Sequence, residues 1–300
     1  MVAVIETVGL TKFYGDAPGI IDLDLEVREG EIFGFLGPNG AGKSTTIRTL
    51  LNFLLPTRGS GTIFGLDIHR DTVAIKRRTG YLPGDLSLYD RMTAREFLLY
   101  FANLRKVDTR THVRELADRF QLDLDRPIKN LSTGNRQKVG LVNALMHEPE
   151  LLILDEPTSG LDPLMRQEFL DLLEEVREEG RTVFLSSHIL PEVERVADRV
   201  GIVRDQHLVT VDSVEAFKGL ANATVTIRFA SIPDPRSFAA LESVIGVDPR
   251  NGGDTLVLTI DGTIDEVIKM AAEQEVLSIS TRSGELEEVF LSYYTDADAQ

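Results

Sequence analysis

The stretch from Gly37 to Thr45 constrains the fold of this chain more than any other part of its sequence. It fits the phosphate-binding pattern G-x-x-x-x-G-K-[ST] at every fixed position. An apolar run of strand length, Ile32–Leu36, comes directly before it, and Ser44–Leu55 can form a helix directly after it. The full set of loop residues is Gly37, Pro38, Asn39, Gly40, Ala41, Gly42, Lys43, Ser44 and Thr45.

Strand, glycine loop and helix together predict an anion site. Glycines let the backbone curl so that its N–H groups point at anionic oxygens, and the helix N-terminus adds partial positive charge. We expect Lys43 to meet the outer phosphates and the Ser44 hydroxyl to serve as a magnesium ligand.

The wider pattern predicts an α/β fold around a largely parallel sheet. Residues 1–30 alternate apolar and polar side chains, which favours antiparallel strands. After residue 30, apolar strands alternate with helical stretches, as in parallel sheets. The expected strands are Ile32–Leu36, Leu151–Leu154, Thr182–Ser186 and Val200–Val203, and the expected helices between them are Lys43–Leu54, Pro163–Glu179 and Ile189–Ala197.

Two regions depart from this alternation and predict further parts of the chain. Residues 85–147 contain helical patterns only, which indicates a helical subdomain inserted in the core; its helices are expected at Thr93–Leu104, Thr109–Phe120 and Asn135–His147. Residues 216–300 predict a separate small α+β domain after a first domain of residues 1–215, and a ferredoxin-like arrangement is one candidate. Its expected strands are Ala223–Ala230, Thr255–Ile260 and Val276–Thr281, and its expected helices are Ser237–Val244, Ile264–Glu273 and Glu285–Tyr294.

A pair of acids marks the second chemical element. Asp155 and Glu156 follow the apolar run Leu151–Leu154, so both are expected at the carboxyl edge of a parallel strand, where ligands of open α/β sheets bind. Asp155 can hold magnesium, and Glu156 can orient and polarise a water aimed at a terminal phosphate. Such strand ends are often only solvated, but a phosphate loop in the same sheet makes the catalytic interpretation strong.

Two weaker signals accompany these elements. His188 follows the strand Thr182–Ser186 and could contact a terminal phosphate, although a surface histidine is the simpler interpretation taken alone. The sequence Leu131–Asn135 begins a helix, so it offers either an ordinary cap or a second anion site that serves another subunit. The remaining histidines show no metal-ligand spacing and are expected at the surface; they are His69, His112, His147 and His207.

The charge and composition exclude several classes of protein. The formal net charge is −16, which disfavours binding to nucleic acid or an anionic lipid surface. No apolar run approaches the roughly 18 residues needed to span a bilayer. The chain contains no cysteine, which fits a reducing cytoplasm, and the N-terminus lacks the pattern of a signal peptide.

In this order, the elements over residues 4–215 resemble the ATP-binding cassette (ABC) ATPases. The resemblance places the family's Walker A motif on Gly37–Thr45, its signature on Leu131–Asn135 and its Walker B motif on Leu151–Glu156. It implies ATP and Mg²⁺ as cofactors and two chains that sandwich two ATP molecules. The remaining roles that it implies are an adenine-stacking ring for Tyr14, a β/γ-phosphate ligand for Lys43, magnesium binding for Ser44 and Asp155, a catalytic base for Glu156, a D-loop residue for Asp162, a switch histidine for His188, and trans ATP binding for Ser132, Thr133, Gly134 and Asn135.

The chain departs from the family pattern at two places. After Tyr81-Leu82-Pro83 the family usually has glutamine, whereas this chain has Gly84 followed by Asp85. Glycine offers no side-chain oxygen to magnesium, so Asp85 either substitutes or the contact is missing. The signature reads LSTGN instead of LSGGQ, yet it keeps its serine and second glycine.

The variant signature and the ending Gly284–Leu291 are similar to ATPases of the daunorubicin-resistance, drug-exporter branch. The resemblance implies an ATP-hydrolysing subunit that forms a homodimer, docks on separate membrane permease subunits from the cytoplasmic face, and powers export. The alternatives are an importer ATPase and a soluble ABC-type ATPase acting on DNA or ribosomes. A small-molecule kinase with the same loop would not explain the residues around Gly134 or His188.

Overall fold

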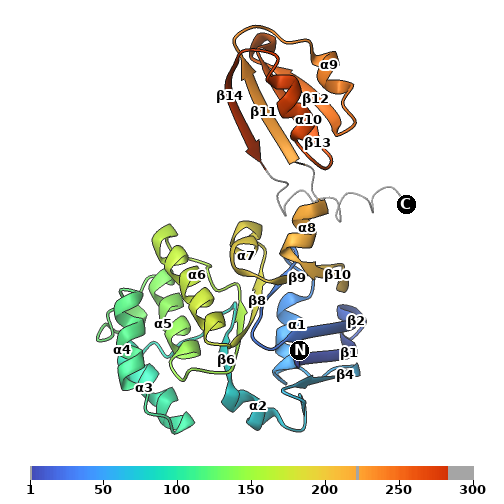
Figure 1. The fold of residues 1–300 in the computed structure, drawn as a ribbon. Coiled ribbons are helices and arrows are strands. Elements are labelled where there is room, and N and C mark those ends of the chain that lie inside the picture. Colours follow the sequence, from blue (N-terminus) through green and yellow to red (C-terminus); the bar gives the residue numbers. More distant parts are fainter. Residues whose placement is uncertain (1, 221–222, 283–300) are drawn as a thin grey trace. The chain divides into compact units, whose positions relative to one another are not determined.

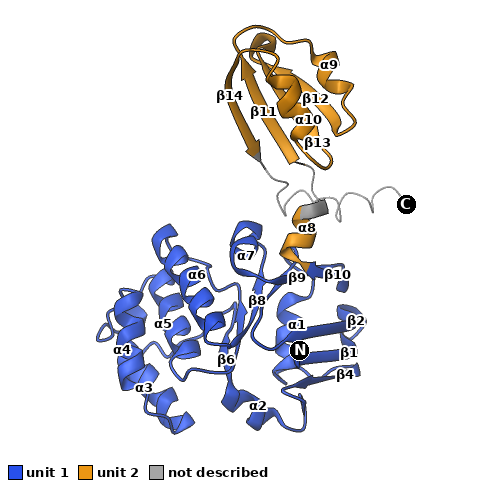
Figure 2. Cartoon of the chain, viewed as in Figure 1, with its two compact units in different colours: residues 1–212 blue, residues 213–300 orange. Residues whose placement is uncertain are grey.

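The computed structural model describes residues 2–220 and 223–282. The chain separates into two compact units, residues 1–212 and residues 213–300, which are coloured blue and orange in Figure 2. The first unit contains two sheets, and the second contains one.

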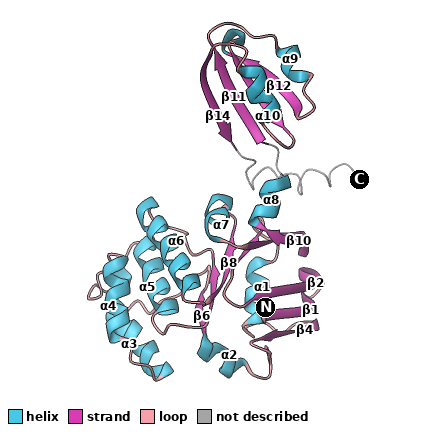
Figure 3. Ribbon diagram, viewed as in Figure 1, coloured by secondary structure: helices cyan, strands magenta, loops and turns pink. Residues whose placement is uncertain are grey.

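A six-stranded sheet forms the centre of the first unit (Figure 3). Parallel pairing joins β3 to β8 and β9, β7 to β8, and β6 to β7. Every residue of β3, β7 and β8 is buried, which is the pattern of strands covered on both faces. In spatial order the strands are β10 (His207–Ser213), β9 (Arg199–Arg204), β3 (Ile32–Leu36), β8 (Thr182–Ser187), β7 (Leu151–Asp155) and β6 (Thr79–Leu82).

A second sheet contains the N-terminal strands β1 (Ala3–Tyr14) and β2 (Ala17–Arg28). They pair antiparallel, and β4 (Arg58–Ile63) and the short β5 (Leu66–Asp67) extend the sheet from the other edge of β1. This confirms the antiparallel subdomain expected from the alternation of residues 1–30. Its buried side chains share one core with Phe33, Phe35 and Phe184 of the central sheet.

Helices complete the first unit (Figure 1). Three of them, α3 (Ala94–Arg105), α4 (Arg110–Arg119) and α5 (Thr133–Leu145), form the helical region expected within residues 85–147. Thr93 and Glu96 make the capping box that starts α3. The other helices are α1 (Lys43–Leu50), α2 (Thr72–Arg78), α6 (Pro163–Glu178), α7 (Leu190–Val196) and the short 3-10 helix η1 (Ile128–Asn130). Within the described residues, none of the helices is long and apolar enough to cross a membrane.

The second unit contains a four-stranded antiparallel sheet in the order β12-β13-β11-β14. Along the chain its elements follow the order β-α-β-β-α-β, which is that of a ferredoxin-like fold. The unit begins with α8 (Val214–Leu220), which is followed by β11 (Ala223–Phe229), α9 (Pro235–Ala239), β12 (Val244–Arg250), η2 (Asn251–Gly253), β13 (Thr255–Ile260), α10 (Asp265–Ala271) and β14 (Val276–Arg282).

Several element boundaries differ from those expected. Helix α1 ends at Leu50 instead of Leu55, because Asn52 takes a left-handed conformation with φ of +53°. The helix expected at Ser237–Val244 is wrong over its second half, since α9 ends at Ala239 and Val244 begins β12. The helix expected at Glu285–Tyr294 lies outside the described residues.

His147 corrects the expectation that it lies at the surface. Its ring is half-buried beyond the end of α5, with Nε2 3.3 Å from the carbonyl oxygen of Thr79, and Nδ1 has no hydrogen-bond partner among residues 2–220 and 223–282. Burial, together with the nearby charge of Arg105, lowers the pKa of His147 to about 4. The imidazole is therefore neutral in the folded chain at neutral pH, whereas in the unfolded chain it titrates near pH 6.5.

This difference predicts a pH-dependent stability. Between pH 6.5 and pH 4 the unfolded chain binds the extra proton, so the stability present above pH 6.5 is lost as the pH falls. We expect the free energy of unfolding to drop about 1–2 kcal/mol more between pH 8 and pH 5 in the natural chain than in a His147→Gln variant. Urea unfolding at both pH values measures this, with the exposed His69→Gln as control. Equal losses in the natural chain and His147→Gln would contradict the assignment.

Candidate nucleotide site

The loop from Gly37 to Thr45 leaves the carboxyl end of β3 and enters α1. Gly40 and Gly42 take left-handed conformations, with φ of +85° and +106°, which side chains rarely adopt. A Cβ atom on Gly42 would lie 2.5 Å from the carbonyl oxygen of Gly19, so this position also lacks space for a side chain. Gln206 holds the loop from outside, because its Nε2 donates to the carbonyl oxygen of Gly40 at 3.0 Å.

A cavity of about 220 Å³ lies over this loop. It brings together the loop, the N-terminal sheet and the acid that follows β7, three segments far apart in the sequence. The tyrosine predicted to stack on adenine lines it, with its hydroxyl 3.3 Å from Thr45 Oγ1. The lining residues are Tyr14, Pro18, Gly19, Pro38, Asn39, Gly40, Gly42, Lys43, Ser44, Thr45 and Glu156.

Lys43 is almost completely buried at the base of this cavity, with 6% of its surface exposed. Its ammonium donates to the carbonyl oxygens of Gly37 at 2.6 Å and Pro38 at 3.2 Å, and lies 3.4 Å from Glu156 Oε1. A buried charge needs such partners, because its removal from water is otherwise costly. The loop thus holds a desolvated cation at a fixed point of the cavity.

Glu156 occupies the centre of the site. Its backbone is left-handed, with φ of +51°, and its N–H donates to the carbonyl oxygen of Ser186 at 3.0 Å. One carboxylate oxygen faces Lys43, and the other lies 2.7 Å from Nδ1 of His188. Oε1 is buried and has no hydrogen-bond partner among the described residues. Lys43 and His188, which follow two different strands, therefore both contact the carboxylate of Glu156.

Asp155 ends β7 one residue earlier and is buried, with 1% of its surface exposed. The hydroxyl of Ser186 donates to its Oδ1 at 2.8 Å. A Cβ atom built on Gly84 would lie 3.2 Å from Asp155 Oδ2, so the backbone of residue 84 borders this carboxylate. Asp85 is exposed.

The signature residues lie elsewhere on the first unit. Ser132 caps α5, its hydroxyl accepting the N–H of Asn135 at 3.3 Å, while Thr133 and Gly134 begin the helix. None of these residues lines the cavity over Lys43. Asp162 caps α6 in the same way, accepting the N–H of Met165 at 3.0 Å.

The signature and the segment after Glu156 are in direct contact. A Cβ atom on Gly134 would lie 2.5 Å from the carbonyl oxygen of Gly160, so the two backbones meet without space for a methyl group. The side chain of Gln137 fixes the same segment, because its Nε2 donates to the carbonyl oxygen of Pro157 at 2.8 Å. Gln137, Ser186 and Gln206 were not predicted as site residues.

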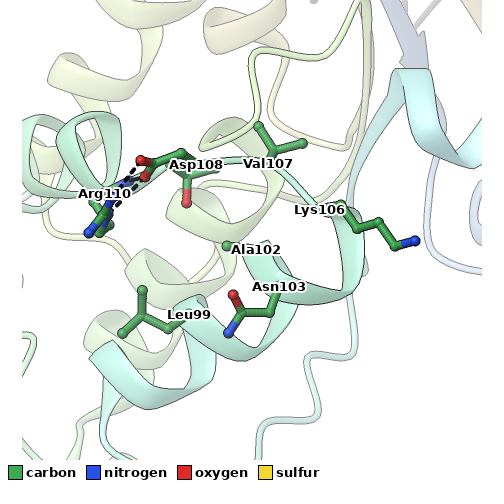
Figure 4. A pocket seen from close by; sticks show the side chains of 8 residues that line it. Leu99, Ala102, Asn103, Lys106, Val107, Asp108 and Arg110 are labelled. Atoms are coloured by element: carbon green, nitrogen blue, oxygen red, sulfur yellow. Dashed lines mark hydrogen bonds and ion pairs between the residues drawn. The ribbon is translucent and has the colours of Figure 1, made fainter.

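Another cavity, of about 390 Å³, lies where α3 leads into α4 (Figure 4). Three charged side chains line it, Lys106, Asp108 and Arg110, and the last two pair with each other at 2.7 Å. It contains no glycine loop and none of the predicted site residues. The chemistry of phosphate is therefore concentrated in the cavity over Lys43.

A phosphate loop and two acids at the same edge of a parallel sheet define a P-loop nucleotide hydrolase. The family model "ABC transporter" matches residues 20–159. A solved structure described as the ATP-binding subunit of an ABC transporter superposes with a TM-score of 0.68 at 30% identity, covering 72% of this chain and 92% of that one.

Curated relatives give the same result. The bacitracin transport ATP-binding protein BcrA of Bacillus licheniformis is 40% identical over 211 residues, 69% of each chain. A probable multidrug ABC transporter ATP-binding protein of Escherichia coli, YbhF, is 37% identical over 205 residues, 67% of this chain and 35% of its own length. The chain belongs to the ABC transporter ATP-binding family. It is an ATP-hydrolysing, nucleotide-binding subunit of a transporter.

Proposed function

We propose that two copies of this chain enclose two ATP molecules and cleave them with a water activated by Glu156. The observation that carries the proposal is the position of one carboxylate between Lys43 and His188, at 3.4 Å and 2.7 Å. Lys43 marks where the terminal phosphates would lie, so a water beside Glu156 is within reach of the γ-phosphate. Turnover by the Glu156→Gln variant tests the proposal.

The residues divide the chemistry between them. The backbone N–H groups of the loop and Lys43 bind the phosphates, and Glu156 takes the proton of the attacking water. His188, with half of its side chain exposed, holds the other carboxylate oxygen and is free to contact the γ-phosphate. The Tyr14 ring at the cavity edge provides a surface for adenine.

The oxygen donors of Ser44 and Asp155 suit Mg²⁺, which prefers few protein ligands together with phosphate oxygens and waters. When bound, the ion supplies charge neutralisation on the phosphates. Ser186 orients Asp155 for this role by occupying its Oδ1.

The position of the signature supports a site completed by a second chain. Ser132, Gly134 and Asn135 begin α5 with exposed or half-buried positions, yet they do not reach the cavity over Lys43. A helix N-terminus of this kind attracts anions. We therefore assign it to the ATP of a partner copy, with Asp162 at the shared interface.

The chain is further proposed to power export from the cytoplasmic face of the membrane through separate permease subunits. The names of two relatives, a bacitracin transport protein and a probable multidrug transporter, support a drug or another hydrophobic compound as the cargo. Exposed apolar side chains on and beside α3 support a docking surface for the permease. They are Tyr89, Leu99, Tyr100, Leu104 and Val107.

Charges introduced on that surface should uncouple the chain from its membrane partner. We expect Tyr100→Asp combined with Leu104→Asp to reduce co-purification of the permease at least tenfold, because each carboxylate would be desolvated on docking. The affinity for ATP should stay within twofold. The control is Val8→Asp, which changes an apolar side chain on β1 that is as exposed as Leu104. Undiminished co-purification in the double variant would rule out this surface.

Because Gly84 has no side-chain oxygen, we expect this chain to bind magnesium more weakly than a chain with glutamine at this position. A glutamine there places an amide oxygen beside Asp155, so Gly84→Gln should lower the Mg²⁺ concentration for half-maximal hydrolysis roughly threefold to tenfold. Titration of Mg²⁺ at saturating ATP measures this. Gly84→Ala is the matched control, because it adds the same Cβ, 3.2 Å from Oδ2, without the amide. Identical titrations for the two variants would show that no contact is missing.

A further inference from the structure

The buried carboxyl group of Glu192, outside the nucleotide cavity, links the chain segments that carry Glu156 and His188. Glu192 lies on α7, with only 6% of its surface exposed, and its Oε2 accepts a hydrogen bond from the hydroxyl of Thr158 at 2.7 Å. Thr158 is itself 2% exposed. A hydrogen bond between two groups so far from water is costly to break, since both are left without a partner.

The contact joins segments that carry the reacting groups. Thr158 follows Glu156 by two residues, and Glu192 follows His188 by four. Because Glu156 and His188 also touch, at 2.7 Å, the four residues form a closed ring of contacts and short chain segments. Two contacts therefore hold Glu156 and His188 at their distance: their own contact and the hydrogen bond between Thr158 and Glu192.

A third element is attached to the same carboxylate. Arg166 Nε on α6 lies 3.1 Å from Glu192 Oε1, and α6 packs beside α7 (Figure 1). Burial raises the pKa of Glu192, whereas the hydrogen bond from Thr158 and the charge of Arg166 act in the opposite direction. Helix α6 starts at the cap Asp162, so the whole segment from Glu156 to Asp162 is tied at its middle and at its end.

We propose that Glu192 is a positioning residue for ATP hydrolysis, which holds the Glu156–Asp162 segment against α7 so that Glu156 and His188 keep their relative positions. This inference rests on the roles proposed above for those two residues. Within the described part of the chain, the hydrogen bond and the ion pair of Glu192 go to Thr158 and Arg166, and neither residue belongs to the phosphate loop. Its effect should therefore fall on catalysis and not on binding.

The test uses the chain of 300 residues. Glu192→Ala and Thr158→Val should each lower kcat roughly 10- to 100-fold, the range expected when a catalytic group is misplaced by about 1 Å. The dissociation constant for ATP should stay within twofold. Thr158→Ser, which keeps the hydroxyl, should remain within threefold of the natural kcat. The double variant should lose no more than Glu192→Ala alone, because that variant already lacks the hydrogen bond that Thr158→Val removes.

Hydrogen exchange provides a readout independent of turnover. In Glu192→Ala, amides of residues 156–162 and 188–196 should exchange at least fivefold faster, while those of residues 37–45 stay unchanged. Glu178→Ala, which removes an exposed glutamate from α6, is the control for charge.

Two results would overturn the inference: unchanged kcat and exchange in Glu192→Ala, or additive losses in the double variant. Failure of the proposed function looks different, since it would appear as normal turnover in Glu156→Gln whatever the result for Glu192.

Discussion

Replacement of Glu156 by glutamine is expected to abolish turnover while ATP still binds. The amide keeps the size of the side chain but cannot accept the proton of the attacking water. General-base catalysis is worth about 10²–10⁴-fold, so kcat should fall at least 100-fold. Because the phosphate ligands stay in place, the affinity for ATP should change less than threefold. Two copies should then remain associated around uncleaved ATP, which size-exclusion chromatography with and without ATP measures.

The matched control for this variant is Glu178→Gln, an exposed glutamate on α6 that should retain natural turnover. Rapid hydrolysis by Glu156→Gln would remove this residue from the role of base. Loss of ATP binding in the same variant would instead indicate that its contact with Lys43 shapes the loop.

The second large effect is expected at Lys43. Truncation to alanine removes the buried ammonium that donates to Gly37 and Pro38 and faces Glu156. Hydrogen bonds to charged groups contribute about 1.5–3 kcal/mol each, so the loss of two phosphate contacts should weaken ATP binding at least 100-fold. Equilibrium titration with a fluorescent ATP analogue measures the change.

Lys129→Ala, an exposed lysine in the helical region, controls for the loss of one positive charge. Thermal unfolding of both variants separates loss of binding from loss of fold. Unchanged nucleotide affinity in a folded Lys43→Ala chain would mean that the loop is only structural.

Much of this site could be predicted because its parts are short and local. The strands β3, β7 and β8 are continuous apolar runs, and the polar groups that follow them must meet at one edge of a parallel sheet. The glycines of the loop predict the left-handed backbone that the structure has at Gly40 and Gly42. The sequence thus placed Lys43, Glu156 and His188 close together, and the structure agrees.

What escaped prediction depends on partners distant in the sequence. Gln206 acts on Gly40 across 166 residues, and nothing in its own neighbourhood signals this. Ser186 is a small residue at a strand end, and only the folded structure shows that it donates a hydrogen bond to Asp155. His147 is polar and follows a helix, so the sequence favours the surface, yet tertiary packing buries it. Strand β6 was missed because four residues carry too little periodicity.

The tight approach of Gly134 to the carbonyl of Gly160 has a mechanical consequence. Because there is no space between the two backbones, a movement of the signature toward Gly160 must also move the segment that ends at Asp162. A single spectroscopic label on either loop would therefore follow the motion of both.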